Sequence, residues 1–162
     1  MKIKLIKGRP ESKDNIASFE AELGRSVPID FSEFVQTNDG AELETNIFDI
    51  GDGNESGVNG FIPISQIHNE MRNIENLPPH AFPVAWAEGG NYVLIKQGMN
   101  SGVYFWDHER PESMTRLAEN FSSFLGVLKP FDISSINLKP GQVMKAWIDP
   151  DFLKKMTPPA NQ

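Results

Sequence analysis

Apolar residues follow a helical period at the front of the chain, a strand-like pattern through its middle, and a helical period again further on. In the first block, residues 12–23, apolar side chains recur on one helix face. Ser12 or Asp14 can cap its start, and Gly24 is expected to end it. A second short helix is expected over 29–37. Helices at the ends and strands in the middle predict an α+β domain with a central antiparallel β-sheet and packed helices.

The middle of the chain consists of short apolar segments separated by glycine, proline and asparagine. The expected strands are 46–50, 61–64, 82–87, 91–96 and 103–106. Gly51–Gly57 is expected to be a loop, and Glu88–Gly90 the turn of a hairpin. Since Pro63 lacks a backbone N–H, the strand that contains it is expected at a sheet edge.

Later helices are expected from their caps and their apolar spacing. Ser65 is expected to cap a short helix, and residues 113–128 hold the strongest helical pattern of the chain. Asp149 and Pro150 are typical of one further helix start. We therefore expect a single domain over 1–162, with a core of about 12–128 and a C-terminal helical extension over 131–162.

The chain has 162 residues and no cysteine. No apolar run approaches the roughly 20 residues that span a bilayer. We therefore expect a cytoplasmic protein with no membrane partner, since a small domain without disulfides fits a reducing compartment.

The net charge of −7 comes from one part of the chain. Between Ser26 and Met71 there are nine acidic residues and no lysine or arginine. Direct nucleic-acid binding is not expected, because phosphates are neutralised by basic side chains. Clustered negative charge favours a basic partner protein, whereas the alternative is a solvated surface that only keeps the protein soluble.

The segment Asp107-His108-Glu109 is the only tight cluster of titratable residues. Neighbours on an extended chain point in opposite directions, so the three side chains are not expected to act together. No catalytic residue is therefore predicted, and the chain is not expected to be an enzyme.

The sequence predicts neither a metal site nor a cofactor. His68 and His80 lack zinc-type spacing to a second histidine. The acids at 49, 52 and 55 lack the ligand spacing of a calcium loop, and the glycines nearby form no phosphate-binding motif.

The aromatic residues lie mostly at core spacing, as in Trp86, Phe105, Trp106, Phe121 and Phe124. Tyr104 and Trp106 are candidate anchors for a partner on the condition that they face outward.

Four landmarks of the sequence occur in a familiar order. Residues 23–34 (LGRSVPIDFSEF) followed by 38–42 (NDGAE) resemble the opening of the SUKH superfamily, which includes the Smi/Knr-type domain. Residues 61–67 (FIPISQI), 102–109 (GVYFWDHE) and 118–125 are similar to its later landmarks. Val27 stands where leucine is common in the family, and it preserves the apolar character.

The resemblance implies an α+β fold and, in bacteria, an immunity protein that binds and neutralises a polymorphic or contact-dependent toxin. Many such toxins are nucleases, which are basic because they hold phosphates. An acidic face would complement them. The expected partner-binding residues are Glu42, Glu44, Asp49, Asp52, Glu55, Tyr104, Trp106, Asp107, His108 and Glu109.

Two other functions remain open at this point. One is a regulatory scaffold domain of Smi/Knr type that binds other proteins. The other is a small hydrolase that uses His108 with Asp107 or Glu109.

Overall fold

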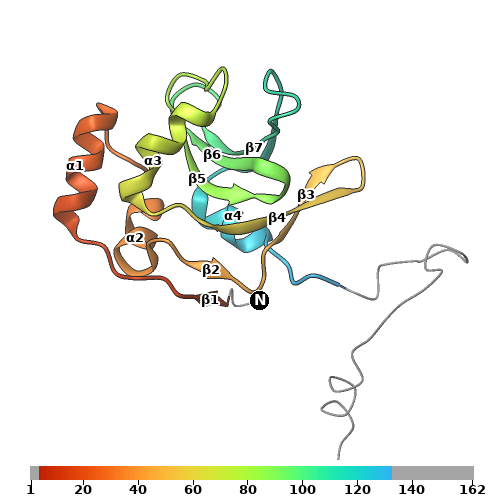
Figure 1. The fold of residues 1–162 in the computed structure, drawn as a ribbon, viewed down its shortest axis with the longest axis horizontal. Coiled ribbons are helices and arrows are strands. Elements are labelled where there is room, and N and C mark those ends of the chain that lie inside the picture. Colours follow the sequence, from red (N-terminus) through yellow and green to blue (C-terminus); the bar gives the residue numbers. More distant parts are fainter. Residues whose placement is uncertain (1–3, 133–162) are drawn as a thin grey trace, which may run out of the picture. The chain divides into compact units, whose positions relative to one another are not determined.

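The computed structural model describes residues 4–132, which Figure 1 draws in colour. The expected helix at Asp149-Pro150 and residues 133–162 of the expected extension lie outside the described residues. The helices are α1 (Lys13–Leu23), α2 (Ile29–Asn38), α3 (Ile64–Glu70), α4 (Phe121–Val127) and the short 3-10 helices η1 (Met71–Asn73) and η2 (Glu88–Gly90). Within this part of the chain, none of the helices is long and apolar enough to cross a membrane.

The strands form two antiparallel sheets. They are β1 (Leu5–Ile6), β2 (Glu42–Leu43), β3 (Ile47–Gly51), β4 (Asn54–Phe61), β5 (Ala81–Ala87), β6 (Asn91–Lys96), β7 (Gly102–Trp106) and β8 (Met114–Ala118). Strands β1 and β2 pair with each other, and β3 to β8 form a six-stranded sheet in sequence order. The α+β prediction with a central antiparallel sheet is thus confirmed. The edge strands β3 and β8 approach each other, so the sheet curls towards a barrel.

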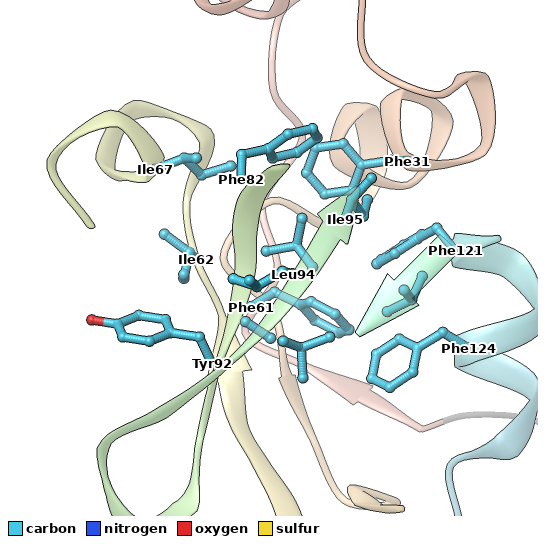
Figure 2. Close-up of a cluster of buried hydrophobic side chains, with 14 of the residues drawn as sticks. Phe31, Phe61, Ile62, Ile67, Phe82, Tyr92, Leu94, Ile95, Phe121 and Phe124 are labelled. Carbon is cyan, nitrogen blue, oxygen red and sulfur yellow. The ribbon is translucent and has the colours of Figure 1, made fainter. Parts of the chain in front are cut away.

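Helices cover both faces of the large sheet. Figure 2 shows Phe31 of α2 and Phe121 and Phe124 of α4 on one side of the strands. The rings of Phe31 and Phe121 lie 5.2 Å apart in an edge-to-face contact. Ile67 of α3 lies on the other side, and Tyr92 of β6 points the same way (Figure 2). The sheet therefore presents one face to α2 and α4 and the other to α3.

Helix α1 begins and ends where the sequence predicts. The side chain of Ser12 accepts a hydrogen bond from the backbone N–H of Asn15. Gly24 ends the helix in the left-handed conformation, with φ of 75°, and its N–H donates to the carbonyl of Glu20. The hairpin of β5 and β6 around Glu88–Gly90 is also confirmed.

The expected helix over 113–128 is wrong in its first half. Residues 114–118 form β8, in which Met114 pairs with Trp106 and Ala118 with Val103. Pairing with β7 overrides the helical spacing, since sheet and core contacts outweigh a weak local preference. Helix α4 begins only after Asn120, whose side chain accepts a hydrogen bond from the N–H of Ser123 at 2.8 Å.

The expected loop over 51–57 is a β-hairpin with a very short turn. Asp52 and Gly53 alone reverse the chain, with φ of 52° and 75°, and β4 begins at Asn54. This is the Asp-Gly turn that suits the twist of paired strands.

The expected edge strand over 61–64 is also wrong. Phe61 ends β4, and Ile64 begins α3 directly after Pro63. The fixed φ of proline suits the start of a helix, so Pro63 marks a helix start and not a sheet edge.

Candidate partner-binding surface

The acidic residues between Ser26 and Met71 do not form one surface. Asp30 accepts a hydrogen bond of 2.9 Å from the backbone N–H of Ser122 in the first turn of α4. Asp39 accepts one of 2.9 Å from the backbone N–H of Ile64, the first residue of α3. These two carboxylates cap helices that are distant in sequence. Burial raises the pKa of the Asp39 carboxyl above its usual value, although the Ile64 N–H acts in the opposite direction.

Glu42 lies on β2 and Glu44 directly follows it, and both pair with lysines that flank β1. The Lys7 ammonium lies 3.1 Å from Glu42, and the Lys4 ammonium lies 2.7 Å from Glu44. All four side chains are well exposed, so each pair contributes little to stability. The lysines reduce the net negative charge that these glutamates present to a partner.

Asp49 of β3 and Glu55 of β4 are direct cross-strand partners. Like charges in this position repel, but the Lys129 ammonium binds both carboxylates, at 2.9 Å from Asp49. The hydrogen bonds that the ammonium donates, to Glu55 first and then to Asp49, raise the pKa of Lys129. This part of the expected contact list is also largely neutralised within the molecule.

Asp52 differs from these residues. Within residues 4–132 its carboxylate makes no hydrogen bond or ion pair, and it is exposed at the tip of the β3–β4 hairpin. Together with Asp107 and Arg110, it lines a hollow of about 170 Å³ that lies between the hairpin and the connection from β7 to β8. The fold thus brings together two acids that are 55 residues apart in the sequence.

The cluster Asp107-His108-Glu109 is held by backbone and amide contacts. The backbone N–H and the ring Nδ1 of His108 both donate to Asn91 Oδ1, at 3.0 and 2.8 Å. Asp107 Oδ1 accepts from the backbone N–H of Glu109 at 2.9 Å. The His108 ring is therefore bound to an amide and not to either neighbouring carboxylate, which is not the arrangement of a general base with its orienting acid.

Three turns lie at one end of the large sheet. Val58 of β4 pairs with Ala87 of β5, and Tyr92 of β6 pairs with Trp106 of β7. The β3–β4 turn, the β5–β6 turn and the β7–β8 connection therefore lie at the same end of the sheet. Their exposed or half-buried acids form what we call the acidic end: Asp52, Glu88, Asp107, Glu109 and Glu112. Arg110 is the basic residue on these turns.

Glu88 and Glu112 are members of the acidic end that the sequence did not single out. Glu88 packs over Gly57 of β4, where a Cβ atom would lie 3.1 Å from its carboxylate. The position of Glu88 could have been predicted from its glycine-rich turn, since hairpin turns place their side chains at a sheet end.

Tyr104 and Trp106 do not meet the condition for partner anchors. Their exposed fractions are 8% and 3%. The Tyr104 hydroxyl donates to the Asn100 carbonyl, and the Trp106 indole N–H donates to the Pro111 carbonyl. Both residues are buried and have polar partners, so they stabilise the sheet and its loops. Of the two tryptophans among the described residues, Trp86 is the one that remains partly exposed.

Residues 4–132 contain no group of three histidine, aspartate or glutamate side chains placed to hold a metal ion. His68 lies 3.9 Å from Glu22, and the Arg25 guanidinium lies 2.9 Å from Nδ1 of His80. Both histidines thus have partners on α1 or just after it.

A family model matches most of the part of the chain that the structure describes. It is the model of the SMI1 / KNR4 family (SUKH-1), and it matches residues 10–126. The matched segment runs from just before α1 into α4. No curated protein matches the chain.

Proposed function

The chain belongs to the SMI1/KNR4 family (SUKH-1), and from this we propose that it is a cytoplasmic immunity protein that binds and neutralises a cognate bacterial toxin. Inhibition is stoichiometric: the protein covers part of the toxin surface and catalyses no reaction. The toxin is of the polymorphic or contact-dependent kind and carries a basic surface, as a nuclease does.

The acidic end is the observation that supports this proposal. Five carboxylates lie on three neighbouring turns that carry one arginine. The two-residue turn at Asp52-Gly53 positions Asp52, and the contacts of His108 with Asn91 hold the segment that contains Asp107 and Glu109. Fixed charges of one sign accelerate encounter with a partner of opposite sign and disfavour acidic proteins. The acids paired with Lys4, Lys7 and Lys129 contribute less to this field, so we assign them a secondary role.

The test is capture of the product of the adjacent gene, followed by rescue. The full chain is used to pull down the upstream gene product from cells, and co-expression is then scored for protection against its toxicity. The proposal expects a stable complex and protection that requires near-equimolar protein. Protection by far less than one equivalent would overturn stoichiometric inhibition, and toxicity that persists despite a stable complex would overturn neutralisation.

The same family match supports one alternative, a regulatory scaffold domain of Smi/Knr type. Such a domain would bind host proteins, and its deletion would alter their regulation in cells that carry no toxin gene. Capture of host regulators and no toxic neighbour would favour this alternative.

A further inference from the structure

Trp86 lines a hollow on the sheet face that α3 partly covers. It pairs with Gly60 of β4 on one side and Tyr92 of β6 on the other. The hollow has a volume of about 370 Å³ and is lined by Asn59, Trp86, Ala87, Gly90, Asn91 and Tyr92. Figure 2 shows Tyr92 pointing to this side of the strands, away from Phe121 and Phe124.

Gly60 lies beside both Trp86 and Glu42. A Cβ atom built there would lie 3.9 Å from Trp86 Cε3 and 3.8 Å from Glu42 Cγ. The ring of Trp86 and the side chain of Glu42 therefore both lie next to this glycine. A second carboxylate borders the aromatic pair, because the Tyr92 hydroxyl donates to Glu70 of α3 at 2.6 Å.

Two amide side chains at the hollow retain unused polar atoms. A β-bulge at Asn59 turns its amide towards the Ala87 carbonyl, to which Nδ2 donates at 3.2 Å. Asn91 Oδ1 accepts both hydrogen bonds from His108. Within residues 4–132, Asn59 Oδ1 and Asn91 Nδ2 have no hydrogen-bond partner, so both can serve a bound group.

We propose that this hollow binds an arginine side chain of the partner protein, with its guanidinium stacked on Trp86. A cation over an indole face is attracted by the ring, and the planar guanidinium stacks better than an ammonium. Glu42, Glu70 and Asn59 Oδ1 supply acceptors around the ring. Glu42 already pairs with Lys7. Because this ion pair is exposed, an incoming guanidinium can displace the lysine.

The hollow adjoins the acidic end, because Asn91 lines the hollow and holds His108, which lies between Asp107 and Glu109 of the acidic end. The inference rests on the proposed function for its basic partner and adds a division of roles. The acidic end sets the rate of association, whereas the arginine in the hollow sets the rate of dissociation.

The first experiment needs no partner. N-acetyl-arginine amide is titrated into the 15N-labelled full chain, and the indole N–H signals are followed by NMR, with Trp86→Phe identifying the Trp86 signal. The neutral N-acetyl-citrulline amide and N-acetyl-lysine amide are the matched probes. We expect a saturable shift of the Trp86 signal, strongest with arginine and absent with citrulline. An equal shift with citrulline, or none with arginine, overturns the proposal.

The second experiment uses the captured partner. Trp86→Leu keeps an apolar side chain but loses the aromatic face, whereas Trp86→Phe keeps a weaker one. We expect Trp86→Leu to speed dissociation about tenfold and Trp86→Phe by only about two- to threefold. Equal effects of the two variants would indicate a simple apolar anchor and would contradict arginine stacking. An unchanged Trp106 indole signal verifies that each variant is folded.

Failure of this inference and failure of the proposed function are distinguishable. A captured toxin whose dissociation is insensitive to Trp86→Leu would refute the arginine site and leave the immunity function standing. Arginine-specific binding in a protein that protects against no toxin would support the arginine site and refute the immunity function.

Discussion

The carboxylate of Asp39, just after the last residue of α2, accepts a 2.9 Å hydrogen bond from the backbone N–H of Ile64, the first residue of α3. Pro63, which precedes α3, has no side chain that can cap it. The start of α3 therefore depends on a residue 25 positions earlier in the chain. This contact also ties α3 to α2, which lies against the opposite face of the sheet.

Replacement of Asp39 tests this cap. Asp39→Ala removes the acceptor and should lower the free energy of unfolding by about 1 kcal/mol. Asp39→Asn keeps an acceptor without a buried charge. Because burial raises the pKa of Asp39, the protonated form is favoured in the fold, and the associated stability is lost as pH rises through the folded-state pKa. In urea unfolding at neutral pH, the free energy of unfolding of the asparagine variant should thus equal or exceed that of the wild type.

A useful control is Asp14→Ala, which changes an exposed acid in the first turn of α1. It should lower stability less than Asp39→Ala does, since Ser12 supplies the cap of that helix. Equal losses in the two alanine variants would contradict a specific role for the Asp39–Ile64 contact.

Ionisation of Tyr92 should destabilise the fold at alkaline pH. Burial and then the hydrogen bond to Glu70 raise its pKa to about 12. The folded state holds the phenolic proton more tightly than the unfolded chain does. The resulting stability is complete below the ordinary tyrosine pKa of 10.0 and disappears as pH rises to about 12. Ultraviolet titration should show a tyrosinate transition near pH 12, and Tyr92→Phe should remove it together with the alkaline loss of stability.

Lys129 should stabilise the β3–β4 hairpin, because its ammonium bridges two carboxylates that would otherwise repel each other. Lys129→Met leaves Asp49 and Glu55 facing each other across the strands, so the unfolding midpoint should fall at low salt and recover partly at high salt. Adding Asp49→Asn to the same chain should restore the midpoint, because it removes the repulsion. The backbone pairing of Lys129 with Ile47 is kept in these variants, so a midpoint that does not recover with Asp49→Asn would contradict the bridging role of the ammonium.

Local signals in the sequence were sufficient for some elements of this fold. The Ser12 and Gly24 caps predict α1, and the glycines after Ala87 predict the β5–β6 hairpin. Asp52-Gly53 carried an equally local signal, which the surrounding glycines and asparagine obscured. Strand β8 is different: its apolar residues also fit a helix, and only pairing with β7 makes it a strand.

The candidate surface could be predicted only in part, because local sequence identifies the acids but not their neighbours in space. Glu42 is neutralised by a lysine 35 positions earlier and Asp49 by one 80 positions later. Asp30 caps a helix that begins about 90 residues later. These long-range contacts decide which acids remain available, and Asp52 with Asp107 are the ones that the fold brings together.

The acidic end gives the last prediction, a change in association rate. Asp52→Asn, Glu109→Lys and Glu112→Lys together should slow association with the basic partner about tenfold or more at low salt, and the effect should shrink as salt is added. Asparagine is chosen at position 52 because it tolerates the positive φ of that turn. The control combines Asp14→Asn, Glu33→Lys and Glu75→Lys, which change the net charge equally at exposed positions away from the three turns. Stopped-flow or surface-binding kinetics should show little change for the control. If both triple variants slow association equally, net charge and not the acidic end steers the encounter.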